Sequence, residues 1–440
     1  MSSAQQSSVV VVGPRAIPSK RITAGLGGGV ALEWYDWNIY GLMAAFLAPH
    51  FFPSENPVTS TLSALAVFGA GFIARPLGAV VLGPVADRVS HKRVMLLAVG
   101  AMSATSLIIG ILPTFETLGV SAGVVLLILR LVQGMATGAE AGVANAVAIE
   151  LAPENARGRY LGLVNGTFLQ VGIVGSGVVA FAVSAMVPSG TMAEWGWRIP
   201  FLIGGVLGVV VVFLRSSLPE TLFAAVDHKQ DQLHEIKATT GGVWKALWQV
   251  RLALAAVVLV IGAITVANYA WITGLPAVAN SVYKENPTGV FGVLVAMGLL
   301  WIVAGPLVGR LSDRFGSPRV FVIVRLLLIP SVFSVLLYTE PGLGTYAMVM
   351  IVGGLAVGLN MGLYNYIATT LMPKSARTTG VALGYALAAA IFGGTASYLV
   401  VFLRQNDLFW VFPVYVAVLS LLSVIVYRLA VKRGHLYIDQ

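Results

Sequence analysis

The chain has 440 residues, of which 58% are hydrophobic and only 10% are charged, with 27 Lys and Arg against 18 Asp and Glu. A soluble domain carries about 25% charged residues, so this composition excludes a soluble protein of this size. Apolar blocks of about 20 residues favour membrane-spanning helices over an outer-membrane barrel. Cysteine is absent, which excludes disulfides and thiolate metal sites.

Polar, proline and glycine breaks divide the chain into twelve predicted spans. In chain order they cover 22–49, 58–86, 94–113, 120–150, 159–186, 197–217, 251–279, 288–312, 319–338, 344–371, 377–403 and 407–431. The predicted fold is an all-α membrane protein with twelve transmembrane helices in two pseudo-symmetric six-helix bundles. The expected divisions are a cytoplasmic tail 1–21, an N-terminal bundle 22–217, a cytoplasmic linker 218–250, a C-terminal bundle 251–431 and a tail 432–440.

The basic residues gather on one side of these spans. Twenty-one of the 27 Lys and Arg fall in loops and tails of that side, against Lys284 and Arg404 on the other. By the positive-inside rule both termini are cytoplasmic, and we expect a multi-pass protein of the inner (plasma) membrane. The net charge of +9 therefore reflects topology, and nucleic acid is not an expected partner.

Two motifs recur in the two halves. Gly83-Pro-Val-Ala-Asp87-Arg88-Val-Ser90 ends the second span and returns as Gly309-Arg-Leu-Ser-Asp313-Arg314-Phe-Gly316. Pro153-Glu-Asn-Ala-Arg157 returns as Pro373-Lys-Ser-Ala-Arg377. The two offsets are nearly equal, which indicates a parallel repeat of six spans. Carriers built this way place the substrate near the midplane, between the halves.

At these residues the chain resembles the major facilitator superfamily, over nearly its whole length. Arg130-Leu-Val-Gln133-Gly134 in span four resembles a second motif of that superfamily, while Ser90 replaces the last glycine of the first loop copy. The resemblance implies a conformational latch at the cytoplasmic helix ends. Its expected members are Gly83, Asp87, Arg88, Gly309, Asp313 and Arg314, with Arg157 and Arg377 as partners of the two aspartates.

A narrower resemblance is to the metabolite:H+ symporters. It is carried by Leu32-Glu33-Trp34-Tyr35-Asp36-Trp37, Arg75-Pro76-Leu-Gly78, Gln133-Gly134 to Gly138-Ala-Glu140, Glu194-Trp-Gly-Trp-Arg198-Ile-Pro200 and Leu383-Gly384-Tyr385 to Phe392-Gly393-Gly394. That family contains 2-oxoglutarate, shikimate, citrate and proline/betaine carriers, and Ile111-Leu-Pro-Thr-Phe-Glu116-Thr-Leu-Gly is most similar to the 2-oxoglutarate carriers. The resemblance implies proton-coupled symport, with protons as the coupling ion and no other cofactor.

Acidic residues inside the spans are candidates for carrying the proton. Glu33, Asp36, Trp37 and Tyr40 share one face of the first span, at i, i+3, i+4 and i+7. A charge at the bilayer centre costs about 2.5–3.5 kcal/mol, and two carboxylates one turn apart repel, which favours a proton on one of them. We interpret Glu33 and Asp36, together with Glu140 of span four, as proton-coupling candidates. The alternative is that the acids stay ionised and pair with buried arginines.

Arginines, amides and aromatic side chains are the candidates for binding substrate. Gly71 and Gly78 flank Arg75 on one helical face, so a neighbouring helix can approach closely. Arginine offers a planar fork suited to a carboxylate, although Arg130 has the alternative of pairing with Glu140 or a span-one acid to hold helices together. The candidates are Arg75, Arg130, Trp37, Tyr40, Gln133, Asn268, Tyr269, Asn360, Tyr364 and Tyr385, and we expect Asn360 and Tyr364 to share a helical face.

The predicted function is secondary active transport by alternating access, in which a proton drives uptake of a small carboxylate-bearing metabolite such as 2-oxoglutarate or a related organic acid. A symporter of a zwitterionic solute and a proton-antiport exporter are the alternatives. A sensor is disfavoured because the linker 218–250 is too short for an output domain. An enzyme is disfavoured because the sequence has no metal cluster and no nucleotide-binding loop. We expect a monomer in the lipid bilayer, with no metal.

Single-cysteine labelling tests the predicted orientation, since the chain has no cysteine of its own. Ser317→Cys should resist a membrane-impermeant thiol reagent in intact cells and react once the cells are permeabilised. Lys284→Cys, on the other side, should react in intact cells. Labelling of Ser317→Cys from outside would contradict the orientation.

Overall fold

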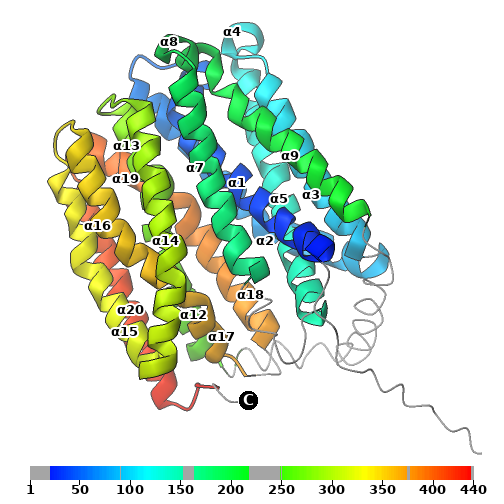
Figure 1. Ribbon diagram of the computed structural model, residues 1–440, viewed down its shortest axis with the longest axis vertical. Helices are drawn as coiled ribbons and strands as arrows, with labels where there is room; N and C mark the ends of the chain where they lie inside the picture. Colours follow the sequence, from blue (N-terminus) through cyan, green and yellow to red (C-terminus); the bar gives the residue numbers. More distant parts are fainter. Residues whose placement is uncertain are drawn as a thin grey trace, which may run out of the picture.

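The computed structural model describes residues 20–89, 91–151, 163–217, 248, 250–373 and 377–437. Every regular element within these ranges is a helix (Figure 1). The first 19 residues of the predicted tail and residues 218–247 and 249 of the predicted linker lie outside the described residues.

The N-terminal half contains six long helices that follow the predicted spans closely. They are α1 (Lys20–Phe51), α2 (Pro57–Val89), α3 (His91–Ile111), α5 (Val120–Leu151), α7 (Phe168–Met186) and α9 (Arg198–Ser216). Among the described residues of this half, four short elements accompany them: α4 (Phe115–Leu118), α8 (Ser189–Thr191) and the π-helical turns η2 (Leu163–Thr167) and η3 (Met192–Gly196).

Three spans of the C-terminal half are interrupted. Its helices are α12 (Arg251–Tyr269), α13 (Leu275–Ser281), α14 (Pro287–Phe315), α15 (Ser317–Val332), α16 (Leu343–Met361), α17 (Tyr364–Thr370), α18 (Arg377–Ala388), α19 (Gly394–Gln405) and α20 (Val411–Lys432). The π-helical turn η4 (Ala270–Gly274) joins α12 to α13, η6 (Ala389–Gly393) joins α18 to α19, and the 3-10 turn η5 (Phe333–Leu337) follows α15.

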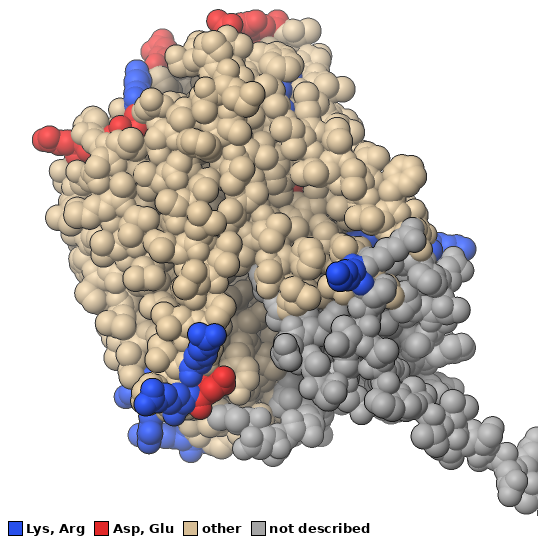
Figure 2. All heavy atoms as spheres, viewed as in Figure 1, with Lys and Arg blue, Asp and Glu red and all other residues tan. Residues whose placement is uncertain are grey.

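The helices have the lengths and outer surface of a multi-pass membrane protein. Eleven helical stretches of the described residues are long and apolar enough to cross a membrane. The remaining long helix, α1, has 32 residues, which at 1.5 Å per residue reach about 48 Å. Figure 2 shows a broad band without charged side chains, with mainly acidic side chains at the end above it and mainly basic side chains at the end below it. These observations confirm the predicted fold class.

The molecule has a basic end and a distal end. The basic end carries the end of α20 and the exposed side chains of Arg310, Arg314, Arg319, Lys432 and Arg433. The distal end, opposite it, carries α4 and α8 (Figure 1).

Close glycine contacts hold α2 against α5, as the spacing of Gly71 and Gly78 predicts. A Cβ atom on Gly78 would overlap the backbone of Met135, and one on Gly138 would overlap the carbonyl of Arg75. Because the obstacles are backbone atoms, a side chain at these positions would separate the two helices. The glycines therefore bring the helix of Arg75 close to the helix of Arg130.

Span ten is not the continuous helix that the sequence predicts. Helix α16 ends at Met361 and α17 begins at Tyr364, with a turn at Gly362 and Leu363 between them. The break falls between Asn360 and Tyr364, so the shared face expected for an unbroken helix stays a prediction. The turn lies where α14 approaches, since a Cβ on Gly362 would lie 2.9 Å from the Cα of Gly305.

The predicted latch is described in its second copy. Gly316 ends α14 with a φ of 85°, a conformation that residues with side chains rarely adopt. Gly309 lies on α14 nearby, and the Asp313 and Arg314 side chains are exposed. Of the first copy, only the backbone of α2 is described at Gly83, Asp87 and Arg88. The side chains of those residues and of Arg377, and all of Arg157, lie outside the described residues, so the latch stays a prediction.

The two halves meet along a seam near the distal end. Helix α14 packs along α7, and α19 packs along α2. A Cβ on Gly69 would lie 2.7 Å from the carbonyl oxygen of Gly394, and one on Gly394 would lie 2.8 Å from that of Gly69. At the distal tip, Thr288 Oγ1 donates to the Ser184 carbonyl over 2.9 Å. The halves are thus closed on one another at this seam.

Substituting a seam glycine should open this contact. We expect Gly394→Val to push α19 from α2, because the backbone carbonyl of Gly69 cannot yield as a flexible side chain would. Cysteines placed at Ser184 and Thr288 report the separation through the rate of cross-linking by a short thiol reagent. The rate should fall at least fivefold in Gly394→Val and stay unchanged in Gly100→Ala, where a Cβ meets open space. Equal rates would contradict the seam.

Candidate functional site

Four charged side chains predicted to lie inside the membrane come together in the N-terminal half. Glu33 and Asp36 come from α1, Arg75 from α2 and Arg130 from α5, and each is buried. Both guanidinium groups lie over Trp37, with their central carbons 3.9 Å and 4.6 Å from its ring centre. An aromatic face attracts a cation, and more strongly away from water. Trp37 is therefore a shared support for the two arginines.

Asp36 and Arg130 form an inner pair that is sealed from solvent. Arg130 Nη1 lies 4.0 Å from Asp36 Oδ2, and the exposed fractions of the two side chains are 0% and 3%. Gln133 bridges them: its Nε2 donates to Asp36 Oδ2 over 2.8 Å, and its Oε1 accepts from Arg130 over 2.7 Å. Ser106 on α3 donates to Asp36 Oδ1. Both carboxylate oxygens thus have a donor.

Aromatic rings complete the seal around the inner pair. The Arg130 guanidinium lies 4.3 Å from the ring centre of Tyr40 and 5.7 Å from that of Phe68, and the Tyr40 hydroxyl donates to the Ala64 carbonyl. Arg130 therefore pairs with a span-one acid, one of the two alternatives that the sequence left open.

Glu33 and Arg75 form an outer pair with more access. Arg75 Nη2 lies 3.6 Å from Glu33 Oε1, and the side chains are 9% and 11% exposed. Arg75 also lies over the ring of Phe72, 5.2 Å from its centre. Its Nε is buried and makes no hydrogen bond to any described residue. The outer pair therefore keeps a guanidinium donor available, next to a carboxylate.

Tyrosines from the C-terminal half face the outer pair. Tyr385 of α18 lies close enough to Arg75 for the two side chains to interact, and the ring of Tyr269 meets that of Phe72 edge-on at 4.9 Å. Tyr364 is buried close to both other tyrosines. The outer pair thus lies at the junction of the two halves, where the repeat predicted a substrate site.

The remaining candidates lie elsewhere or are only partly described. Asn268 is buried, and its Oδ1 makes no hydrogen bond to a described residue. The Asn360 amide is held by Arg325 and by the carbonyls of Val324 and Ala356, so the structure places it outside the Arg75 cluster. Glu140 lies on α5, but its side chain lies outside the described residues.

Arg325, for which the sequence predicts no function, is completely buried in the C-terminal half. It donates to Asn360 Oδ1 over 2.9 Å, to the Val260 carbonyl over 2.9 Å and to Ser423 over 3.4 Å. These partners come from α16, α12 and α20, so Arg325 joins four helices through neutral groups.

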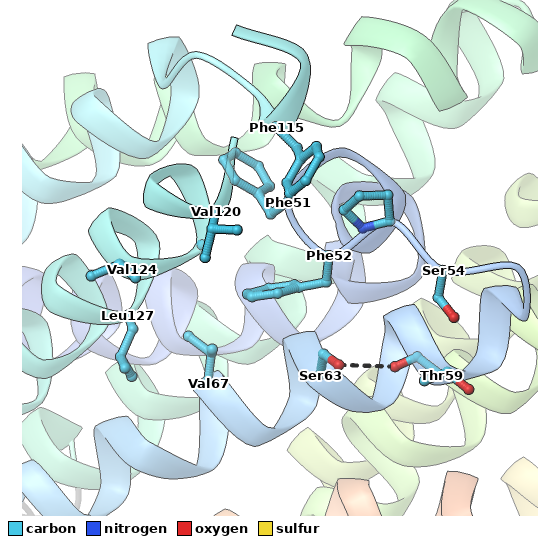
Figure 3. Close-up of a pocket in the computed structure, with 12 residues that line it drawn as sticks. Phe51, Phe52, Ser54, Thr59, Ser63, Val67, Phe115, Val120, Val124 and Leu127 are labelled. Carbon is cyan, nitrogen blue, oxygen red and sulfur yellow. Dashed lines mark hydrogen bonds between the residues drawn. The ribbon is translucent and has the colours of Figure 1, made fainter. Parts of the chain in front are cut away.

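A separate groove of about 520 Å³ lies between the end of α1, α2 and α5 (Figure 3). Its walls include Phe51, Phe52, Val67, Val124 and Leu127. None of its lining residues is charged, so it lacks the chemistry of the paired arginines.

Comparison with known proteins places this cluster in context. The sequence model of the Major Facilitator Superfamily matches residues 26–398. The chain is 31% identical to the alpha-ketoglutarate permease of Escherichia coli (strain K12) over 415 residues, covering 92% of this chain and 93% of that protein. It is 32% identical to the proline/betaine transporter of the same organism over 325 residues, covering 69% and 61%. The crystal structure of a D-xylose-proton symporter superposes with a TM-score of 0.76 at 16% identity, covering 92% and 96%, which shows the shared fold.

The two ion pairs should differ in their contribution to stability. Removing one partner of a buried pair typically costs about 3–5 kcal/mol. We expect Asp36→Asn to approach that cost, because it leaves Arg130 charged and sealed. Glu33→Gln should cost less, since Arg75 keeps access to water and to Tyr385. Thermal unfolding of the detergent-purified proteins measures both, and equal losses would contradict the division into an inner and an outer pair.

Proposed function

Because this chain belongs to the major facilitator superfamily, we propose that it couples a proton to the uptake of a small carboxylate-bearing metabolite across the plasma membrane. The chain is a secondary transporter, not an enzyme, as its relatives are. The observation that carries the proposal is the outer pair Glu33–Arg75 at the junction of the halves.

One set of charges can bind both the proton and the substrate. With Glu33 ionised, Arg75 is already neutralised and offers little to an incoming anion. Protonation of Glu33 leaves Arg75 with an unbalanced positive charge in a low-dielectric space, where leaving it unpaired is costly. The guanidinium fork then accepts a carboxylate in bidentate geometry. Proton and substrate therefore favour each other's binding.

We assign the proton to Glu33 and not to Asp36. Both Asp36 oxygens accept hydrogen bonds, from Ser106 and Gln133, and Arg130 remains beside them in a sealed environment. A proton on Asp36 would leave that arginine without a counter-charge and without a route to the substrate. The inner pair instead fixes the position of Trp37, and the Trp37 ring in turn positions Arg75.

Alternating access follows from the way the halves meet. The positive-inside rule places the basic end in the cytoplasm, so the closed glycine seam lies on the outer side. Arg75 from one half and Tyr385 from the other face each other across the junction. A substrate held between them would draw the halves together, and its release would let the seam open.

Uptake of a labelled panel into proteoliposomes with an imposed pH difference tests the proposal, using 2-oxoglutarate, shikimate and betaine as probes. Arg75→Lys keeps the charge and loses the fork, so uptake of the transported probe should need at least tenfold more substrate. Glu33→Gln should abolish accumulation against a gradient while exchange across the membrane continues.

Matched surface variants serve as controls. Arg310→Lys and Glu116→Gln make the same chemical changes at exposed positions, and both should transport like the unmodified protein. Full pH-driven accumulation by Glu33→Gln would overturn the coupling role of the outer pair.

A zwitterionic solute is the second candidate. The observation that favours it is the adjacency of opposite charges, because Arg75 can bind a carboxylate while ionised Glu33 binds an ammonium group. Betaine in the uptake panel represents this class.

A further inference from the structure

We infer that the site accepts solutes with a single carboxylate, monoanionic or zwitterionic, and discriminates against dicarboxylates and tricarboxylates. The inference rests on the proposed function and narrows its substrate class. The observation behind it is the number of positive charges that the membrane-spanning part can offer to a substrate.

Away from the cytoplasmic ends of the predicted spans, four arginines lie inside a span or at its outer edge: Arg75, Arg130, Arg198 and Arg325. Arg215, buried near the cytoplasmic end of α9, donates to the carbonyls of Gly25 and Met95. Arg198 donates to the carbonyls of Gly110 and Leu112, at 3.1 Å and 2.9 Å, and so closes the distal end of α3. Arg325 is completely buried and bonded to neutral groups of three other helices. Neither is available to a solute at the junction.

Arg130 pairs with Asp36 and Gln133, and its exposed fraction is 0%. Its Nε and Nη2 have no hydrogen-bond partner among the described residues, but the rings of Trp37 and Tyr40 cover the guanidinium, so a solute cannot reach it. Arg75 alone of the four combines partial access, a hydrogen-bond donor without a partner and a place between the halves. One guanidinium fork binds one carboxylate. Glu140, whose side chain lies outside the described residues, is an acid and would add no positive charge.

The described side chains of the C-terminal half near Arg75 form a neutral wall. Tyr269, Tyr364 and Tyr385 offer phenol groups and aromatic faces, which bind hydroxyl, keto or alkylammonium groups. Phenols do not balance a second negative charge, and an unpaired carboxylate in a buried site is costly. The far end of the solute is therefore expected to be uncharged or positive.

Charge balance disfavours a dianion in both protonation states of Glu33. With Glu33 protonated, Arg75 leaves a net charge of +1, which a monoanion cancels. With Glu33 ionised, the pair has no net charge, which suits a zwitterion. A dianion leaves at least one negative charge unbalanced in either state.

Ligand-induced thermal stabilisation of the purified full-length protein tests the inference. The matched probes are 2-oxovalerate and 2-oxoglutarate, which differ by one carboxylate on the same five-carbon chain. Shikimate, betaine and citrate complete the panel, and each compound is titrated at pH 5.5 and pH 7.5. We expect the best single-carboxylate probe to bind at least tenfold more tightly than 2-oxoglutarate or citrate at both pH values.

The outcomes separate the inference from the proposed function. A smaller ratio, or tighter binding of 2-oxoglutarate or citrate, overturns the single-carboxylate inference and leaves carboxylate symport standing. No stabilisation by any carboxylate overturns both.

A substitution that adds a second positive charge provides an independent check. Tyr364→Arg places a guanidinium in the neutral wall, and it should strengthen 2-oxoglutarate binding at least tenfold relative to Tyr364→Phe, which removes the phenol without adding charge. If Tyr364→Arg does not fold, the probe panel on the unmodified protein decides the question. A folded Tyr364→Arg protein with unchanged preference would contradict the charge count.

Discussion

A lipid bilayer cannot solvate an ion, so each charge inside this protein needs a counter-charge or a shell of hydrogen bonds. Two arginines and two acids of the N-terminal half meet that requirement in different ways. Asp36 and Arg130 pair with each other, with help from Ser106 and Gln133, in a space closed to solvent. Glu33 and Arg75 satisfy each other less completely, at the edge that faces the C-terminal half. A transporter needs both kinds of pair: one that fixes the geometry and one whose charges can be exchanged for a proton and a substrate.

Glycine packing makes this arrangement possible. Because Gly71, Gly78, Gly134 and Gly138 carry no side chain, α2 and α5 approach until their backbones touch, and Arg75 and Arg130 can both lie over Trp37. The same device recurs at the distal seam, where Gly69 meets Gly394 across the two halves. Seam and site lie on the same helices, since Gly69 and Arg75 both belong to α2. Movement at the seam is thus mechanically connected to the residues that bind charge.

Apolar blocks and charge placement predicted the spans and the fold class, because both depend on the bilayer and not on tertiary detail. The sequence also identified all four members of the two ion pairs, since charges inside apolar helices are rare. The pairing of each acid with its arginine could not be predicted, because Glu33 and Asp36 lie on the same face of the first span. The rotation of α1 about its axis decides which arginine each acid meets, and that rotation is set by tertiary packing. Ser106 was missed because a lone serine in an apolar span has no distinguishing pattern. The sequence places Asn360 among the substrate-binding candidates because nothing near it in the chain indicates its partner. That partner, Arg325, lies on another helix. The helix break at Gly362 and Leu363 also has no strong signature in the sequence.

The account claims that one shared charge pair links proton binding to carboxylate binding, and proton uptake on ligand binding tests that claim most directly. In weakly buffered detergent solution with a pH indicator, saturating shikimate should cause the unmodified protein to take up about one proton per bound molecule. The predicted uptake is lost in Glu33→Gln and kept in Asp36→Asn, provided that shikimate binding is verified in each by thermal shift. Binding without proton uptake, or the same uptake in Glu33→Gln, would contradict the account.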